Sequence, residues 1–240
     1  MRSSTIAAPS SFALNVNHLL QKIECRPIES DEDLDRVMRL RYAAYLKEGA
    51  IGPNETGRLE DRFDALENTV NIGVFHDERL VAAKRFHFLS KPDDVSPTYF
   101  AFPDILRPHL EAGKRIVDPN RFIVDYDTAR EFPHLAYVTV RLSVIASAFY
   151  DTHLTTVSVR PEHQAFYRRA FFATQAAEPR LYPGLTKQLC LMLVDYEKDR
   201  DRIYARGSYY ASTPDEQERL FGKIKSAGGA FPPPRPDQPA

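Results

Sequence analysis

An acidic pair and a distant arginine are the first residues of this chain whose types and spacing suggest chemistry. Asp61 and Asp64 lie three residues apart in the sequence LEDRFD. Arg41 shares the apolar face of an expected helix with Met38 and Tyr45. A buried guanidinium group is strongly unfavourable unless a carboxylate meets it. We therefore expect the acidic pair to bind Arg41.

Two further arginines are expected to join this network. Arg85 lies in AAKRF and Arg121 in DPNRF, and both sequences read as strands. The arginines would order the acidic loop over a reaction site, and a guanidinium group left partly free could bind a carboxylate through two hydrogen bonds. Asp118, which begins DPNRF, could accept the proton of an attacking amine. An ion pair of Asp118 with Arg121 or Arg41 is the alternative, and both interpretations stay open.

Apolar periodicity places these residues in one α/β (α+β) domain that spans residues 21–226. The expected strands are 21–28, 70–76, 80–89, 115–125, 155–160 and 189–196, and the expected helices are 30–49, 105–112, 138–150 and 162–170. Pro119 cannot donate to a strand ladder, so it predicts a bulge or an edge position. Residues 1–20 are expected to form a flexible segment and the proline-rich residues 227–240 a disordered tail.

Composition argues against several classes of protein. Lysine plus arginine (32) nearly balances aspartate plus glutamate (33), so the net charge gives no reason to expect a nucleic-acid partner. No apolar run approaches the length of a transmembrane segment. Cys25 and Cys190 are far apart, which favours a reducing compartment and a cytoplasmic location. The seven histidines show no metal-binding spacing, and no metal is expected.

The sequence VRPEHQAFYRRAFF, at residues 159–172, resembles the strand-to-helix segment of GNAT acyltransferases, which often contains FYxxxGF. This resemblance implies a GNAT-like fold with a mixed central sheet, a splayed strand pair and flanking helices. The pantetheine arm of a thioester donor would lie between the splayed strands. Tyr167 would inherit the role of protonating the leaving thiolate, although packing in the core also explains an aromatic residue there.

The arginine and acid pattern resembles that of the acyl-homoserine lactone synthases and the long-chain N-acyl amino acid synthases. Those families share an arginine and an aromatic residue four apart, two acids three apart, an arginine ending the third strand, and Glu-x-Ser-Arg-Phe on the fourth. This chain has DPNRF in place of the last motif, with a shorter acid. It has Ile51 where the lactone synthases carry tryptophan, which favours the amino acid synthases.

This resemblance implies an acyltransferase that joins a fatty acyl group from a thioester to the amine of an amino acid. Catalysis would involve Asp118, Arg121 and Tyr167, and backbone N–H groups at a bulge would hold the oxyanion. The remaining network residues would bind substrate. They are Arg41, Tyr45, Asp61, Asp64 and Arg85.

The donor is expected to be an acyl carrier protein rather than coenzyme A, with no tightly bound cofactor. Coenzyme A-dependent relatives carry a glycine-rich loop for the pyrophosphate, whereas no glycine lies between Asp125 and Val138. A docking patch for the carrier could comprise Lys114, Arg115, Arg130 and Arg141. A coenzyme A-dependent N-acetyltransferase, a lactone synthase-like enzyme and a non-catalytic acyl- or carrier-binding module stay open as alternatives.

Overall fold

A computed structural model describes residues 10–226 and contains one mixed sheet of seven strands in the order β1-β2-β3-β4-β5-β7-β6. The strands are β1 (Glu24–Pro27), β2 (Thr69–His76), β3 (Arg79–Leu89), β4 (Ile116–Val124), β5 (Leu154–Val159), β6 (Thr174–Leu181) and β7 (Gln188–Asp195). Neighbouring strands are antiparallel except β4 and β5, which are parallel. The α/β class expected from the sequence is confirmed.

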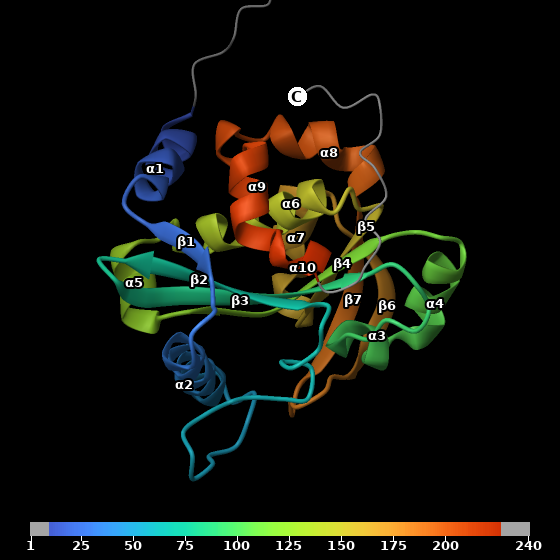
Figure 1. The fold of residues 1–240 in the computed structure, drawn as a ribbon, viewed down its shortest axis with the longest axis horizontal. Coiled ribbons are helices and arrows are strands. Elements are labelled where there is room, and N and C mark those ends of the chain that lie inside the picture. Colours follow the sequence, from blue (N-terminus) through green and yellow to red (C-terminus); the bar gives the residue numbers. More distant parts are fainter. Residues whose placement is uncertain (1–9, 227–240) are drawn as a thin grey trace, which may run out of the picture.

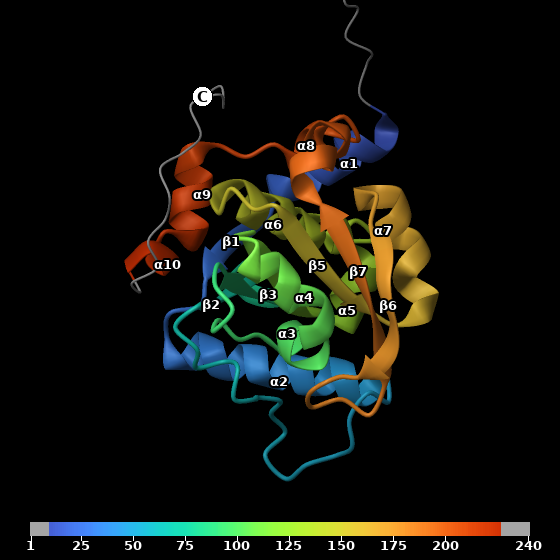
Figure 2. The same ribbon diagram turned by 90° about the vertical axis from the view of Figure 1, so that its right-hand side faces the viewer.

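Helices cover both faces of the sheet (Figures 1 and 2). The helices are α1 (Ser11–Leu20), α2 (Asp31–Lys47), α3 (Pro97–Ala101), α4 (Pro103–Glu111), α5 (Tyr126–Glu131), α6 (Leu135–Phe149), α7 (Gln164–Phe171), α8 (Tyr196–Tyr204), α9 (Pro214–Phe221) and α10 (Lys223–Ser226), with single 3₁₀ turns at Pro161–His163 and Ser208–Tyr210. In Figure 1, α2 lies below the sheet and α1, α6 and α9 lie above it. The apolar α6 packs in the largest core cluster, because its long apolar face meets the inward residues of β3, β4 and β5.

The parallel strands β4 and β5 separate soon after they begin. They pair only through Ile116 with Leu154 and Val117 with Thr155, although both strands continue for several residues. Beyond those pairs, the facing backbone groups of the two strands have no partner in the sheet. The expected splayed strand pair is confirmed.

Strand β4 also carries the expected bulge. Ala83 of β3 pairs with Ile123 and Arg85 pairs with Asn120, so β4 has one residue more than β3 in this interval. Arg121 lies within it and has a positive φ of 49°, an uncommon conformation for a residue with a side chain. The alternative of an edge position for Pro119 is wrong, because β4 lies between β3 and β5.

The expectation of a flexible segment over residues 1–20 is wrong for its second half. Ser10 caps α1, and Ala13, Val16 and Leu19 are buried by the core. Their spacing of three residues forms one apolar stripe on a helix, which the exposed Leu14 and the polar residues between them obscure in the sequence. Residues 1–9 and the expected tail at 227–240 lie outside the described part of the chain, so the proposed domain limits stay a prediction.

Strand β6 and helices α8 and α9 were not expected from the sequence. Strand β6 lies at the edge of the sheet and is mostly exposed or half-buried, which removes the apolar alternation that marks a strand.

Within residues 10–226, no helix combines the length and apolar character needed to cross a bilayer.

Candidate active site

The acidic loop between α2 and β2 meets three arginines from three different elements. Asp64 accepts a hydrogen bond of 2.7 Å from Arg41 of α2, and Arg85 of β3 lies 2.7 Å from the same oxygen. Asp61 accepts bonds of 2.7 and 3.1 Å from Arg85 and a bond of 2.6 Å from Arg121 of β4. The ion pairs expected from residue spacing are therefore present.

Backbone contacts hold the loop in the shape that the ion pairs require. The Asp61 N–H donates to Asp64 Oδ2 over 3.0 Å, and the Phe63 N–H donates to Asp61 Oδ1 over 2.9 Å. Phe63 is buried, and its carbonyl oxygen lies 3.1 Å from His87 Nε2. The loop is thus anchored on β3 by an apolar side chain as well as by charge.

The network contains three guanidinium groups and two carboxylates, so one positive charge is not balanced within it. Arg41, Arg85 and Arg121 are all at most 4% exposed. Two of their nitrogens, Arg41 Nε and Arg121 Nη1, are buried without a hydrogen-bond partner among the described residues. A buried donor without a partner is unfavourable. Arg121 is therefore suited to binding one more anionic group.

The arginines also determine the charge state of the loop. Burial alone would raise the pKa of Asp61, but the hydrogen bonds and charges of Arg85 and Arg121 outweigh it and hold that pKa far below its usual range. Burial would also raise the pKa of Asp64, but the charges of Arg41 and Arg85 outweigh this effect, so the pKa of Asp64 is lowered. A lowered folded-state pKa stabilises the fold above the unfolded-state pKa of about 4, and this stabilisation decreases as the pH falls further.

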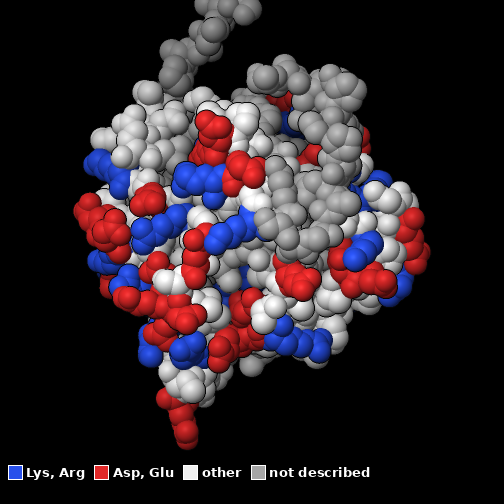
Figure 3. Space-filling view, viewed as in Figure 1, with Lys and Arg blue, Asp and Glu red and all other residues white. Residues whose placement is uncertain are grey.

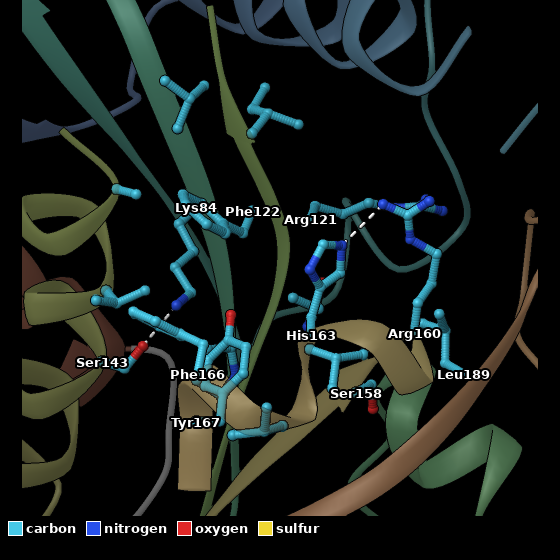
Figure 4. Close-up of a pocket in the computed structure, with 18 of the residues that line it drawn as sticks. Lys84, Arg121, Phe122, Ser143, Ser158, Arg160, His163, Phe166, Tyr167 and Leu189 are labelled. Atoms are coloured by element: carbon cyan, nitrogen blue, oxygen red, sulfur yellow. Dashed lines mark hydrogen bonds between the residues drawn. The ribbon is translucent and has the colours of Figure 1, made fainter. Parts of the chain in front are cut away.

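A cavity of about 730 Å³ opens between the splayed strands and α6 (Figure 4). Its volume falls within the range of roughly 300–1,000 Å³ typical of small-molecule sites. Most of its wall is apolar, with Val140 and Val144 from α6, Val157 from β5, Phe166 from α7 and Val194 from β7. The cavity is suited to an extended hydrocarbon chain.

Three of the residues selected from the sequence line this cavity. Arg121 and Tyr45 both lie in its wall, and the guanidinium carbon of Arg121 is 5.4 Å from the centre of the Tyr45 ring. Tyr167 of α7 also lines it and packs against Phe166 and Phe171. Burial, with Tyr45 nearby, raises the pKa of Tyr167 to about 12, so its hydroxyl stays protonated at neutral pH and can donate a hydrogen bond.

Asp118 is fully buried but binds hydroxyl groups rather than arginine. It accepts a bond of 2.7 Å from the Thr98 hydroxyl, another of 2.6 Å from the Thr156 hydroxyl, and a longer one of 3.3 Å from the Thr98 N–H. The alternative ion pair with Arg121 or Arg41 is wrong, because the acidic loop binds both of those guanidinium groups.

Hydroxyl groups connect Asp118 to the cavity. Thr98 Oγ1 lies 3.0 Å from Ser158 Oγ and 2.9 Å from Tyr182 Oη, and both of those residues line the cavity. A proton can move along such a chain by exchange of hydroxyl hydrogens. Sequence reasoning missed Thr98, Ser158 and Tyr182. They belong to three separate segments that meet only in the folded protein, and no spacing in the sequence indicates the contact.

Lys84 of β3 is a further cavity residue that sequence reasoning missed. It is 4% exposed, and its amino group donates to Ser143 Oγ of α6 over 2.7 Å. Burial lowers its pKa to about 7, although Asp118 acts in the opposite direction. The sequence did indicate a buried lysine, since the alternation of β3 places Lys84 on the same face as the buried Ala82 and Phe86.

The docking patch expected from four basic residues is not formed as such. Arg141 is buried and pairs with Glu216 while donating to the carbonyl oxygens of Tyr209 and Ala211, so it anchors the C-terminal helices. Arg115 pairs with Asp151. On the face that Figure 3 presents, lysine and arginine are interspersed with aspartate and glutamate. Within residues 10–226, no group of three or more His, Cys, Asp or Glu side chains is placed to hold a metal ion.

Comparison with solved structures identifies the class of fold. FeeM, an N-acyl amino acid synthase from uncultured soil microbes, is 15% identical over 75% of this chain and 93% of its own, with a TM-score of 0.63. BjaI, a CoA-dependent acyl-homoserine lactone synthase, is 17% identical over 77% of this chain and 89% of its own, with a TM-score of 0.54. The GNAT-like acyltransferase fold expected from the sequence is confirmed. No curated protein sequence matches the chain.

The family is defined by a sequence model. The model of the N-acyl amino acid synthase FeeM matches residues 36–195, which include the arginine network, Asp118 and Tyr167. The chain belongs to this family, and it is an N-acyltransferase.

Breaking the Arg41–Asp64 contact should destabilise the fold. Replacing Asp64 by asparagine leaves the buried Arg41 without its carboxylate partner and should lower the free energy of unfolding by roughly 3 to 5 kcal/mol. Replacing Arg41 by methionine should cost less, because Asp64 keeps its contact with Arg85. The double variant should be little worse than the worse single variant, because the two residues act as a unit. Urea unfolding of the three variants measures these values.

Arg36→Met provides the matched control on the same helix. Arg36 is 47% exposed and pairs with Glu32 and Asp33, so its removal should cost under about 1 kcal/mol. Strictly additive losses at Arg41 and Asp64, or losses no larger than that of Arg36→Met, would contradict the buried network.

Proposed function

We propose that this enzyme joins a fatty acyl group, presented as a thioester on an acyl carrier protein, to the amine of an amino acid. The observation that carries the proposal is the unbalanced positive charge of the arginine network beside a largely apolar cavity. Arg121 Nη1 is buried without a partner, and Arg121 lines the cavity. A carboxylate of the acceptor would supply the missing acceptor oxygen.

The splayed strands suit the arm of the donor. Past Val117 and Thr155, the facing backbone groups of β4 and β5 do not pair with each other. The two amide groups of a pantetheine arm can hydrogen-bond to such free strand groups, as an added strand would. The acyl chain would then lie in the apolar cavity beside α6, which removes its surface from water.

A carrier protein suits the donor end of the site better than coenzyme A. Helix α6 begins without a side-chain cap, and Phe12 of α1 packs on its first turn, with ring centres 5.1 Å from His134 and 4.7 Å from Tyr137. A pyrophosphate would have to compete with this packing. An acyl carrier protein presents only a phosphopantetheine group, without a pyrophosphate. The basic residues of the cavity wall that lie near solvent are Lys47, Arg160 and Lys187. A cytoplasmic reaction accords with this donor and with the two free cysteines.

The proposed reaction forms an amide bond and breaks the thioester C–S bond. The neutral amine attacks the thioester carbon, and Arg121 and Phe122, which have no partner in β3, offer backbone N–H groups to the oxyanion. The amine proton passes through Ser158 and Thr98 to Asp118. Tyr167 donates a hydrogen bond, and then a proton, to the departing thiolate.

Asp118→Asn should lower kcat by about a hundredfold or more, because general-base catalysis contributes roughly 10²–10⁴-fold. Thr98→Val should reproduce most of that loss, since it interrupts the proton path while keeping the side-chain shape. Asp104→Asn is the control, because Asp104 forms an exposed pair with Arg180. Steady-state kinetics and thermal unfolding of each variant separate lost turnover from lost folding. A wild-type kcat in Asp118→Asn would remove it from catalysis.

The purified enzyme should form N-acyl amino acids from a long-chain acyl carrier protein and a mixture of amino acids, as detected by mass spectrometry. The same acyl group on coenzyme A should react at least tenfold less efficiently in kcat/KM, because its pyrophosphate lacks a binding site. Equal or better use of acyl-coenzyme A would contradict the choice of donor. Absence of any amide product with either donor would refute the synthase function.

A further inference from the structure

Lys84 and Ser143 form a polar spot in the apolar cavity wall. Lys84 lies on the face of β3 that also carries the buried Ala82, Phe86 and Phe88, and it is the one charged residue there. Its amino group crosses to Ser143 of α6 (Figure 4). The Phe122 ring centre lies 5.4 Å from the same nitrogen. The mechanism proposed above does not use this amine.

The amino group is incompletely bonded in its present surroundings. The hydrogen bond to Ser143 uses one of its hydrogens, and no carboxylate in the described part of the chain forms an ion pair with it. A buried amine with unused donors is unfavourable, and a methionine would fill the same space without that cost. Packing alone therefore does not explain a lysine at this position.

Another polar pair on the same cavity wall has hydrogen-bond partners within the protein. The Ser147 hydroxyl donates to the Ser143 carbonyl oxygen over 2.8 Å and lies 2.7 Å from the Thr155 hydroxyl. Those two hydroxyl groups bond to each other and need no ligand. Lys84 differs, because among the described residues only Ser143 accepts a hydrogen bond from its amine, and both residues line the cavity.

The register of the sheet locates Lys84 relative to the reaction. It lies between Ala83, which pairs with Ile123, and Arg85, which pairs with Asn120, so it is opposite the bulge at Arg121 and Phe122. Neighbouring strands are about 4.8 Å apart. The Lys84 backbone is thus next to the segment whose N–H groups are proposed to bind the thioester oxygen, and its amine extends toward α6 in the cavity proposed for the acyl chain.

We propose that Lys84 and Ser143 recognise an uncharged oxygen substituent, a hydroxyl or an oxo group, on one of the first carbons of the acyl chain. This inference rests on the proposed function, because it assigns the cavity to the acyl group. The Lys84 amine donates to the substituent oxygen, and Ser143 orients the amine. A carboxylate substituent is disfavoured, since it would have to lose its hydration in a largely apolar cavity.

The enzyme therefore selects its donor by a hydrogen bond to the acyl chain. A site built to bind a polar group discriminates strongly against the analogue without it, because the buried donor is then left unpaired. The wild-type enzyme should use 3-hydroxy- or 3-oxoacyl carrier protein about 10- to 100-fold more efficiently in kcat/KM than the unsubstituted chain of equal length. A hydroxyl group at the far end of the chain should bring no such gain.

Lys84→Met is the decisive variant, because it removes the amine while keeping an unbranched side chain of similar size. It should lose the preference for the oxygenated donor and use the unsubstituted donor as well as, or better than, the wild type. A change of preference in this direction cannot come from impaired folding, which would lower both activities together. Ser143→Ala should shift the ratio in the same direction by a smaller factor.

Thr139→Val is the matched control on α6. Its hydroxyl is buried and donates to the Leu135 carbonyl oxygen, and it does not line the cavity. This variant should keep the wild-type ratio between oxygenated and unsubstituted donors. A wild-type enzyme without preference for any oxygenated chain, or a ratio unchanged in Lys84→Met, would overturn the inference.

Binding measurements keep this test independent of turnover. Unreactive pantetheine amides of 3-hydroxydodecanoic, 3-oxododecanoic and dodecanoic acid can be titrated into the enzyme by calorimetry. Tighter binding of the oxygenated chains in the wild type, lost in Lys84→Met, supports the site even if no amide product is ever found. Absent turnover with every donor would instead refute the proposed function, and equal binding of all three chains would refute the inference alone.

Discussion

Three buried guanidinium groups meet two carboxylates in this enzyme, and the position of the acidic loop depends on that arrangement. Arg41, Arg85 and Arg121 come from α2, β3 and β4, so the loop joins three elements that are distant in sequence. Charges removed from water need close and well-oriented partners. The loop therefore has one favourable position, across the sheet and beside the cavity.

The bulge in β4 links this network to the splayed strands. At Arg121 the backbone adopts a positive φ, and the side chain reaches Asp61 while also lining the cavity. The same interval leaves Arg121 and Phe122 without partners in β3. In the proposed mechanism, this single irregularity in one strand supplies a cation for the acceptor and free N–H groups for the thioester oxygen, beside the splayed strands where the donor arm would bind.

The sequence alone predicted the part of this site whose residues can be recognised by their spacing. Arg41 on an apolar helix face required a carboxylate, and Asp61 and Asp64 were the evident acids. The partners of Asp118 could not be predicted, because Thr98 and Thr156 belong to segments separated by 58 positions that only the folded sheet brings together. Lys84 could have been found, since strand alternation alone placed a lysine among buried apolar residues.

The most direct test of this account compares two acceptors that differ only in charge. The amino acid used by the wild-type enzyme and its primary carboxamide should differ by about a hundredfold or more in kcat/KM, because only the carboxylate pairs with Arg121. In Arg121→Gln this difference should largely disappear. Equal use of the amino acid and its carboxamide by the wild-type enzyme would contradict the claim that the unbalanced arginine network binds the acceptor.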